Sequence, residues 1–492
     1  METKRLFLWI LGISTLARLL MARIVPIAGD EAYFIIWAKH PNYGYYEHPP
    51  MIGWIMWLFS FFGDDIFVYR IFPVIVVPAM ALLMVNLIRE IDEKKAYLCG
   101  AIFLLSPVGI LNVLSVNDVP LIFFTFLAGI FFYKALRRNR LMNAALSGFF
   151  GGCAFLSKYF FVLFFLAVLV YCIISKKKEV WKIAVVAFFF GLPLIFINLL
   201  WNYNNCWLNV MFNLFFRNKN VSFNFLSIIV YVIEQAVLMT PFLAVAFIKS
   251  GLLRNRIKNE ASLKAFWYFF MVPQIFFFGL SFFRNIGFHW TASFFPFFFM
   301  LLVFMRQDVV DRAVRHAFYL SMTFIIAVLV LVSIPIGALK SLKKYPQIVM
   351  FKEPAKLCAA INKKAEGRIL ASTGYTEASV LAYYCKNEFV LFGSMSRSGR
   401  YYDFINDFKN FDGRDFLIVS LNEKDSEKFR NYFKTISVDQ IDICGAKFYF
   451  IFGCGFIFNN YRELYLAKIL ETYYSPPNLL PLRKNFFKEK YF

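Results

Sequence analysis

The sequence has few charged residues and few histidines for its length. Of its 492 residues, 17% are Asp, Glu, Lys or Arg, and only 4 are His. Soluble proteins average about 25% charged and about 45–50% apolar residues, whereas this chain is 60% hydrophobic and 20% aromatic. A soluble protein is therefore nearly excluded. Disorder is excluded as well, because 65 Phe and 26 Tyr supply ample apolar surface to bury.

The chain also lacks the short motifs of many common enzymes. No Walker A, GxGxxG, HExxH or GxSxG pattern occurs in it, which argues against nucleotide hydrolysis as an energy source. Its 8 cysteines are scattered, without CxxC or metal-type spacing. Those in apolar runs are expected to be small core residues. The four beyond residue 340 could pair in three alternative ways or stay free.

Long apolar runs dominate the first two thirds of the chain. A helix needs about 20 mostly apolar residues to cross a bilayer. This rule predicts eleven transmembrane spans, two of them short, near residues 6–26, 66–88, 96–113, 119–136, 143–157, 160–175, 182–200, 226–248, 264–281, 290–305 and 315–338.

The basic residues lie in clusters between these runs. The formal net charge of +22 would suggest nucleic acid as a partner in a soluble protein, but clusters at alternate helix ends are typical of cytoplasmic membrane loops. We therefore expect membrane lipids and no nucleic acid as partners. The clusters are Lys4–Arg5, Arg89–Lys95, Arg137–Arg140, Lys176–Lys178, Lys249–Lys258 and Arg306–Arg315.

The acidic residues divide the chain into two regions. Residues 1–339 hold 15 Asp and Glu, and the last 153 residues hold 16. We predict a multi-spanning membrane domain over 1–339 and a water-exposed domain over 340–492 on the outer, extracytoplasmic side. The segments GRILAST, FVLFG, DFLIVSL and KFYFIFG are predicted strands, and they alternate with helix-like stretches, which favours a small α/β sheet for acceptor recognition or as a lid.

Two outer loops carry acidic residues next to the membrane. Asp30 and Glu31 follow the first span directly, and a carboxylate there could take a proton from an attacking hydroxyl group. The alternative is a helix-capping pair. Asp118 follows another span and precedes Pro120, so it is either a functional carboxylate or an N-cap.

The string Tyr45 to Pro50, YYEHPP, is the most distinctive in the chain. Its two prolines forbid helix at His48 and hold Glu47 and His48 on an extended backbone. This stiffness suits a binding loop, although it could simply start the apolar helix expected at 51–62, which is too short to span and suits the membrane interface. Glu47 beside an imidazole could ligate a divalent metal or bind a sugar hydroxyl and a phosphate.

Three cations lie on the outer side, where few are expected. Lys158, Arg217 and Arg284 could clamp a phosphate group, or they could extend individually to lipid headgroups. The pair His289–Trp290, at the top of a span, could join the same site, although a single His is more often structural.

Taken in order, these motifs resemble a known family. Asp-Glu-Ala-Tyr after span one, Tyr-Tyr-Glu-His-Pro-Pro-Met, Asn-Asp-Val-Pro, Phe-Leu-Ser-Lys-Tyr, a Trp-Asn loop ending in Arg217, and His-Trp at 289–290 resemble bacterial members of the dolichyl-phosphate-mannose protein mannosyltransferase superfamily. These are GT-C fold glycosyltransferases, and they include the aminoarabinose and galacturonic acid transferases of lipid A.

The resemblance implies roles for individual residues. Asp30 matches the catalytic base, and Asp118 matches a second loop carboxylate near the reacting centre. Glu47 matches a position linked to a metal in the aminoarabinose enzymes, whose string has Lys where this chain has His48. Arg217 resembles the loop arginine that meets the phosphate. The predicted site thus comprises Asp30, Glu31 and Asp118 for catalysis, His48, Lys158, Arg217 and Arg284 for the donor phosphate, and Tyr46, Glu47, His289 and Trp290 for sugar or acceptor.

The implied function is inverting transfer of one sugar from a polyprenyl-phosphate donor to an acceptor hydroxyl. The acceptor would be lipid A, another glycan or a protein, on the periplasmic face of the bacterial inner membrane. The alternative is a flippase that moves lipid-linked sugars without chemistry. A flippase should show internal repeats and ionisable groups along the membrane depth, whereas here the candidate groups gather at one surface and no repeat is seen.

Overall fold

A computed structural model describes residues 2–216, 222–250, 263–477, 480–481 and 483–492 of the chain. It forms two compact units, which we call the helical unit and the α/β unit. The helical unit comprises Met1–Val25, Phe59–Asn198 and Asn220–Val330, and the α/β unit comprises Pro26–Leu58, Leu199–Lys219 and Leu331–Phe492. The α/β unit thus includes two segments from the first half of the chain. The division at residues 339 and 340 stays a prediction.

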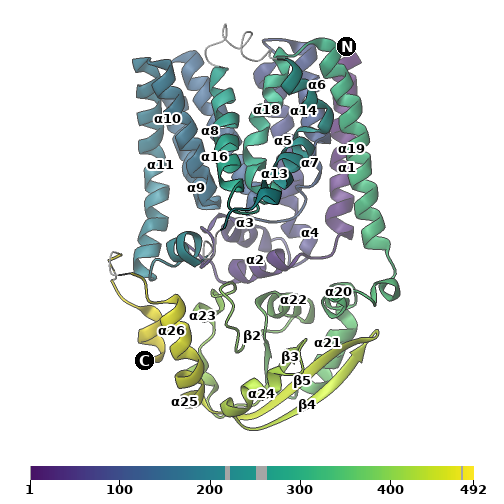
Figure 1. The fold of residues 1–492 in the computed structure, drawn as a ribbon, viewed down its shortest axis with the longest axis vertical. Helices are drawn as coiled ribbons and strands as arrows, with labels where there is room; N and C mark the ends of the chain where they lie inside the picture. The colour runs from purple at the N-terminus through teal and green to yellow at the C-terminus, as the bar shows by residue number, and fades with distance from the viewer. Residues whose placement is uncertain (1, 217–221, 251–262, 478–479, 482) are drawn as a thin grey trace. The chain divides into compact units, whose positions relative to one another are not determined.

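The helical unit is built from apolar helices, of which the longer ones run alongside one another (Figure 1). Each predicted span coincides with one helix or with consecutive helical segments. The helices are α1 (Glu2–Ile24), α4 (Ile66–Tyr69), α5 (Ile71–Ile88), α6 (Glu93–Leu105), α7 (Pro107–Ile110), α8 (Asp118–Arg138), α9 (Leu141–Ser157), α10 (Val162–Ser175), α11 (Lys178–Asn204), α13 (Phe225–Met239), α14 (Pro241–Ser250), α16 (Lys264–Ser281), α17 (Phe288–Thr291), α18 (Phe295–Leu301) and α19 (Gln307–Ser333).

The described residues contain 5 helices that are long and apolar enough to cross a membrane, or up to 6 if one bent pair is a single span. This finding indicates a multi-pass membrane protein, while the predicted count of eleven is not confirmed. The predicted span over 226–248 is not one straight helix, because α13 and α14 meet at 99°, and it is either a broken span or a re-entrant loop. The break falls at Thr240, since Pro241 disfavours a helical conformation at the preceding residue.

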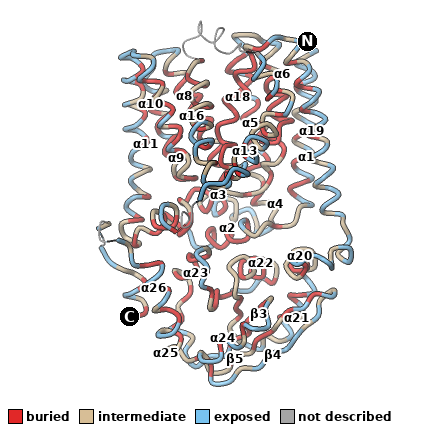
Figure 2. Tube along the Cα trace, in the orientation of Figure 1, coloured by how far each residue is buried: buried red, intermediate tan, exposed pale blue. Residues whose placement is uncertain are grey.

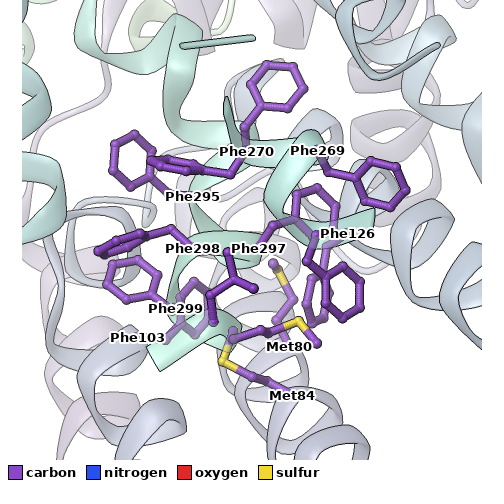
Figure 3. Close-up of a cluster of buried hydrophobic side chains, with 14 of the residues drawn as sticks. Met80, Met84, Phe103, Phe126, Phe269, Phe270, Phe295, Phe297, Phe298 and Phe299 are labelled. Atoms are coloured by element: carbon purple, nitrogen blue, oxygen red, sulfur yellow. The ribbon is translucent and has the colours of Figure 1, made fainter. Parts of the chain in front are cut away.

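The interior of the helical unit is packed with phenylalanine. Every residue of α18 is buried, and the side chains of Phe297, Phe298 and Phe299 meet rings from several other helices (Figure 3). In contrast, the outer helices α11 and α19 expose much of their length (Figure 2). Phe188 to Phe190 on α11 are all exposed. Rings in these positions need lipid rather than water around them, which agrees with a membrane location.

The α/β unit contains a five-stranded mixed sheet in the order β2-β1-β3-β5-β4. β1 pairs in parallel with both β2 and β3, whereas β5 is antiparallel to β3 and β4. The four predicted strands are confirmed, and the structure adds β4. The strands are β1 (Ile369–Ser372), β2 (Val390–Leu391), β3 (Phe416–Ser420), β4 (Phe433–Ile443) and β5 (Ala446–Phe456).

Helices from both ends of the chain complete the α/β unit. The predicted apolar helix at 51–62 forms over Met51–Ser60, directly after the proline pair. The helices are α2 (Gly29–Lys39), α3 (Met51–Ser60), α12 (Leu208–Val210), α20 (Tyr345–Lys352), α21 (Pro354–Ala365), α22 (Tyr375–Cys385), α23 (Tyr402–Ile405), α24 (Asp425–Phe429), α25 (Phe458–Tyr461), α26 (Ala467–Tyr473) and α27 (Phe486–Tyr491).

Strand β4 escaped prediction because it is an edge strand with an exposed surface. Of its residues only Phe433 is buried, so it lacks the apolar alternation that marks a half-buried strand. The turn that joins β4 to β5 is a two-residue hairpin turn. Cys444 and Gly445 both have positive φ, 56° and 83°, as a two-residue hairpin turn of type I′ requires.

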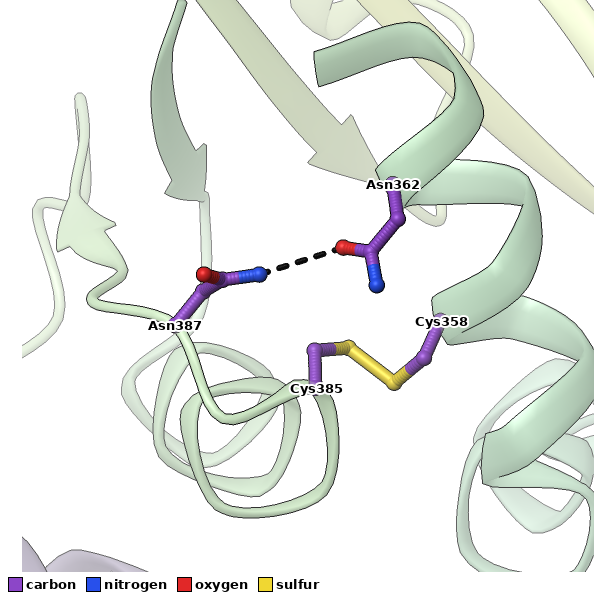
Figure 4. The surroundings of a disulfide bond; sticks show 4 residues. All are labelled: Cys358, Asn362, Cys385 and Asn387. Carbon is purple, nitrogen blue, oxygen red and sulfur yellow. Dashed lines mark hydrogen bonds between the residues drawn. A yellow bond between two sulfur atoms is a disulfide. The ribbon is translucent and has the colours of Figure 1, made fainter. Parts of the chain in front are cut away.

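A disulfide links Cys358 of α21 to Cys385 at the end of α22 (Figure 4). Asn387 donates a hydrogen bond to Asn362 beside it, at 3.1 Å. Cys444 and Cys454 carry free thiols. Of the alternatives left open by the sequence, the structure thus has one bond and two free cysteines beyond residue 340.

Candidate functional site

Asp30 and Glu31 lie in the first turn of α2, where they have different surroundings. Glu31 is fully buried, and its carboxylate accepts a hydrogen bond from the Ala28 amide at 3.0 Å. Of the two carboxylates, Glu31 is therefore the one that caps the helix. Asp30 is exposed. Burial raises the pKa of Tyr375, at the start of α22, to about 12, and the negative charge of Asp30 adds to this effect.

Glu47 is buried in a network of neutral hydrogen-bond donors. Its carboxylate accepts from the Gly399 amide at 2.6 Å and from the Tyr33 hydroxyl at 3.1 Å. The Tyr33 oxygen in turn accepts from the Tyr401 amide at 3.2 Å. Burial raises the pKa of Glu47 to about 7, although these hydrogen bonds oppose the rise. Glu47 therefore titrates in the neutral pH range.

The surroundings of Glu47 do not fit a metal ion. A divalent ion needs several acceptor ligands, whereas the partners described above are an N–H and an O–H donor. Within the described part of the chain, no group of three or more His, Cys, Asp and Glu is arranged to hold an ion. The predicted metal role of Glu47 therefore has no support from its contacts.

Asparagines from the segment 199–219 hold the backbone of the YYEHPP string. Asn209 donates to the carbonyl oxygens of both Tyr45 and Tyr46, and Asn213 donates to that of Glu47 at 3.2 Å. The string is non-helical, as its prolines predicted. The spacing of the two asparagines, one helical turn apart, was a signal for a shared partner that sequence reasoning missed.

Tyr46 packs its ring against Phe212, with 5.5 Å between ring centroids. Its hydroxyl is fully buried and has no hydrogen-bond partner among the residues that the structure describes. Arg400 and Asp403 lie close enough for their charges to act on the pKa of Tyr46, which burial raises well above its usual value. The ring of His48 is 6.5 Å from that of Trp37.

Arg400 and Asp403 form a buried charged pair that the sequence analysis did not single out. Their closest N–O distance is 3.5 Å, and Arg400 is completely buried. Arg400 donates to the Ser394 carbonyl at 2.7 Å, and Tyr474 donates to Asp403 at 2.6 Å. Charged residues spaced i,i+3 within the aromatic stretch SGRYYDF were the available signal. The pair fixes the loop that presents Gly399 to Glu47.

In the helical unit, the structure joins two predicted site residues. The Lys158 ammonium donates to the Asp118 carboxylate at 2.7 Å, and both side chains are buried. Asp118 is the first residue of α8 and the N-cap position belongs to Asn117, so the N-cap interpretation of Asp118 is wrong. Its negative charge lies at the positive end of the helix dipole as well as beside Lys158.

Aromatic rings extend this ion pair toward the other predicted cation. The Lys158 ammonium lies 5.5 Å from the Phe160 ring centroid, and Phe160 is 4.8 Å from Trp290. The Arg284 guanidinium lies 5.0 Å from the centroid of the Trp290 ring. His289 is beside Trp290, with 6.3 Å between the ring centroids. The structure thus brings Asp118, Lys158, Arg284, His289 and Trp290 into one continuous cluster.

The predicted residues therefore fall into two groups. Asp30, Glu31, Tyr46, Glu47 and His48 belong to the α/β unit, and the cluster around Lys158 belongs to the helical unit. Arg217 lies outside the described residues. The assignment of all these residues to one site stays a prediction.

Comparison with known proteins connects part of this sequence to glycosyltransferases. A family model for dolichyl-phosphate-mannose-protein mannosyltransferases matches residues 47–201, a range that includes Glu47, Asp118 and Lys158. The lipid A galacturonosyltransferase RgtD of Rhizobium johnstonii is 30% identical over 134 residues, 26% of this chain. That match spans only 28% of the length of the Rhizobium protein.

Solved structures show the fold of nearly the whole chain. The crystal structure of ArnT from Cupriavidus metallidurans in the apo state has a TM-score of 0.66 and 11% identity, and covers 92% of this chain and 98% of that one. The structure of the same protein bound to undecaprenyl phosphate has a TM-score of 0.65 over 90% of this chain and 97% of that one, again at 11% identity. The chain has the GT-C fold, and the resemblance stated from its loop motifs is confirmed.

Proposed function

We propose that this protein is a glycosyltransferase that takes one sugar from a polyprenyl-phosphate donor and attaches it to an acceptor hydroxyl. The observation that carries the proposal is the fold shared with ArnT over nine tenths of the chain, together with the family match through 47–201. One ArnT structure is bound to undecaprenyl phosphate, and the Rhizobium relative is named for transfer to lipid A.

The chemistry we propose is an inverting displacement with Asp30 as general base. The acceptor oxygen attacks the anomeric carbon as its proton passes to the Asp30 carboxylate, and the bond from that carbon to the phosphate oxygen breaks. The polyprenyl phosphate leaves with the electron pair. The exposure of Asp30 supports this role, because a base must reach a bound hydroxyl, whereas Glu31 is occupied as a helix cap.

Cations would stabilise the departing phosphate. Lys158 and Arg284 are candidates because aromatic contacts hold both of them in one cluster of the helical unit. Asp118 would act by positioning the Lys158 ammonium, to which it is hydrogen bonded at 2.7 Å. Positive charge fixed where negative charge develops lowers the barrier without reorganisation during the reaction.

The location we propose is the bacterial inner membrane, with the site and the C-terminal domain facing the periplasm. The alternation of basic clusters along the chain supports this orientation. A periplasmic site also suits a donor that already carries an activated phosphate, since no nucleotide is needed there. The acceptor would be lipid A, another glycan or a protein.

The test is transfer by the purified full-length protein. Undecaprenyl phosphate linked to mannose or to galacturonic acid serves as donor and lipid A as acceptor, with the product measured by mass spectrometry. Because an amide cannot take the proton, Asp30→Asn should lower turnover by about 10²–10⁴-fold. The matched control is Asp439→Asn, which removes only an exposed ion pair with Lys364 and should leave turnover unchanged.

Each outcome decides a separate part of the proposal. Turnover that is unchanged in Asp30→Asn would remove Asp30 as the base while leaving the activity in place. Absence of transfer from both donors by the wild-type protein, with folding verified by its unfolding transition, would count against the proposed function.

A further inference from the structure

A cavity lies in the α/β unit at the point where the order of its parallel strands reverses. The chain passes from β1 through α22 to β2 on one side of β1, whereas β3 lies on the other side. In open α/β sheets, the crevice beyond the carboxyl ends of strands at such a point is the usual ligand site. Here a cavity of about 200 Å³ lies between the residues that follow β1 and those that follow β3.

The lining of this cavity is polar but carries no positive charge. Among the described residues that line it there is no Lys, Arg or His, whereas Glu377 and Asp425 supply carboxylates and Gln347 and Asn422 supply amides. The apolar residues Met350 and Leu421 complete the wall. A phosphate or other anion would find no cation among these residues, so the lining disfavours an anionic ligand.

The polar groups differ in how firmly they are engaged within the protein. Asp425 accepts from Ser420 and from Lys428, each at 2.7 Å, so its role is to hold the loop after β3. Glu377 accepts a single described side-chain bond, from Gln347 at 3.2 Å. An ionised carboxylate has about four acceptor positions, which leaves Glu377 with acceptor capacity toward the cavity.

This combination of groups suits a sugar ring. Hydroxyl groups donate to carboxylates and bond to amides in both directions, while the C–H face of a ring can rest on Met350 or Leu421. The volume is below the roughly 300 Å³ at which sites for drug-sized ligands begin, so it accommodates one ring and not an oligosaccharide. We propose that the cavity between β1 and β3 binds a single uncharged or amino-bearing pyranose through Glu377, Gln347 and Asn422.

The residues that line this cavity are not among those assigned to glycosyl transfer, and the proposal concerns binding alone. It can therefore hold or fail whether or not the protein transfers sugar. The ring could belong to a free saccharide or to the headgroup of a glycolipid, since both present the same hydroxyl groups to the cavity.

The experiment uses the full-length protein in phosphatidylcholine nanodiscs, because maltoside and glucoside detergents would compete for the site. Saturation-transfer NMR is recorded with the methyl glycosides of mannose, galactose and glucosamine, with the octyl glycosides of the same sugars, and with inorganic phosphate followed by ³¹P signals. We expect at least one methyl glycoside to bind and phosphate to compete with none of them.

Three variants test the assigned site without disturbing the core. Loss of a hydrogen bond to a charged or amide group should weaken binding about tenfold in Glu377→Gln and in Asn422→Ala. Gly374→Ala provides a third variant, because its new Cβ would displace the Glu377 carboxylate, which is the far end of a flexible side chain. Glu423→Gln, next to Asn422 but outside the lining, is the matched control and should bind like wild type.

The outcomes separate the two sources and can overturn the proposal. Equal binding of methyl and octyl glycosides indicates a free saccharide, and tighter octyl binding that the variants still weaken indicates a glycolipid headgroup. The proposal is wrong if no glycoside binds, if the variants bind as tightly as the control, or if phosphate displaces the sugar.

Discussion

The two units of this protein bury a carboxylate in opposite ways. In the helical unit Asp118 is paired with the ammonium of Lys158 at 2.7 Å. In the α/β unit the hydrogen bonds to Glu47 come from neutral donors, the Gly399 amide and the Tyr33 hydroxyl, and the Arg400 charge has a smaller influence on its pKa. One unit compensates the buried charge with an opposite charge, and the other favours binding a proton, since the pKa of Glu47 rises to about 7.

This difference teaches how each site responds to change. Substituting one partner of a buried ion pair is strongly destabilising, because the other charge is then left without compensation. A carboxylate held by neutral donors changes its protonation instead, so it responds to pH. The helical unit should therefore be sensitive to mutation at its pair and the α/β unit to pH at Glu47.

The largest expected effect comes from breaking the ion pair. Lys158→Met keeps the aliphatic stem but leaves the Asp118 carboxylate buried and unpaired. We expect the free energy of unfolding to fall by about 3–5 kcal/mol, measured by denaturant unfolding in micelles. The double variant Lys158→Met with Asp118→Asn should recover most of the loss, since it removes both charges.

If Lys158→Met were as stable as wild type, Asp118 would not depend on the pair for its burial, and the contrast between the two units would be lost. A double variant that is less stable than either single variant would show that the two residues act through other contacts.

The second prediction concerns pH in the α/β unit. In the folded protein Glu47 holds its proton up to about pH 7, whereas the ordinary Glu pKa is 4.5. Between these values the folded state binds more protons than the unfolded state, so stability falls as pH rises. The contribution of protonated Glu47 to the free energy of unfolding is fully present below pH 4.5, and it is lost as the pH rises through 7. Its size is about 3 kcal/mol.

Glu47→Gln should remove this pH slope, because Gln resembles the protonated acid and still accepts from Gly399. The unfolding midpoint and the hydrogen exchange of residues 394–401 are followed from about pH 5 to about pH 8, with Glu463→Gln as an exposed control that retains the slope. If Glu47→Gln retained the wild-type dependence of stability on pH, a group other than Glu47 would be responsible for it.

The smallest effect separates two tyrosines of the α/β unit. Tyr33→Phe removes a donor to Glu47 and an acceptor for the Tyr401 amide, and should cost about 1–2 kcal/mol of stability. Tyr46→Phe removes a buried hydroxyl that has no hydrogen-bond partner within the described part of the chain, so its stability should change by less than about 0.5 kcal/mol. Thermal unfolding of both variants measures the difference. A larger loss in Tyr46→Phe would show that its hydroxyl has a role in the protein that its contacts do not reveal.

The fold could be predicted to a large extent because its signals are local. Apolar runs marked the helical segments, and short apolar strands marked β1, β2, β3 and β5. The span over 226–248 failed as a single helix because hydropathy counts do not register the break before Pro241. β4 failed because an edge strand with an exposed surface has no apolar alternation to detect.

The candidate site was predicted less completely, because its contacts join distant parts of the chain. The motifs identified Glu47 and Lys158 as notable residues, but nothing in the local sequence paired Lys158 with Asp118, which lies 40 positions earlier. Gly399 lies 352 positions from Glu47, and a backbone amide leaves no trace in a motif. Arg400 and Asp403 were missed for the same reason.

Composition and periodicity alone thus establish a membrane protein with an added α/β region, because burial in lipid or in a sheet depends on the apolar character of each short segment. Tertiary packing alone decides which buried carboxylate meets a lysine and which meets a backbone amide. That choice rests on the distance and direction of groups far apart in the chain, which no local pattern of residues records.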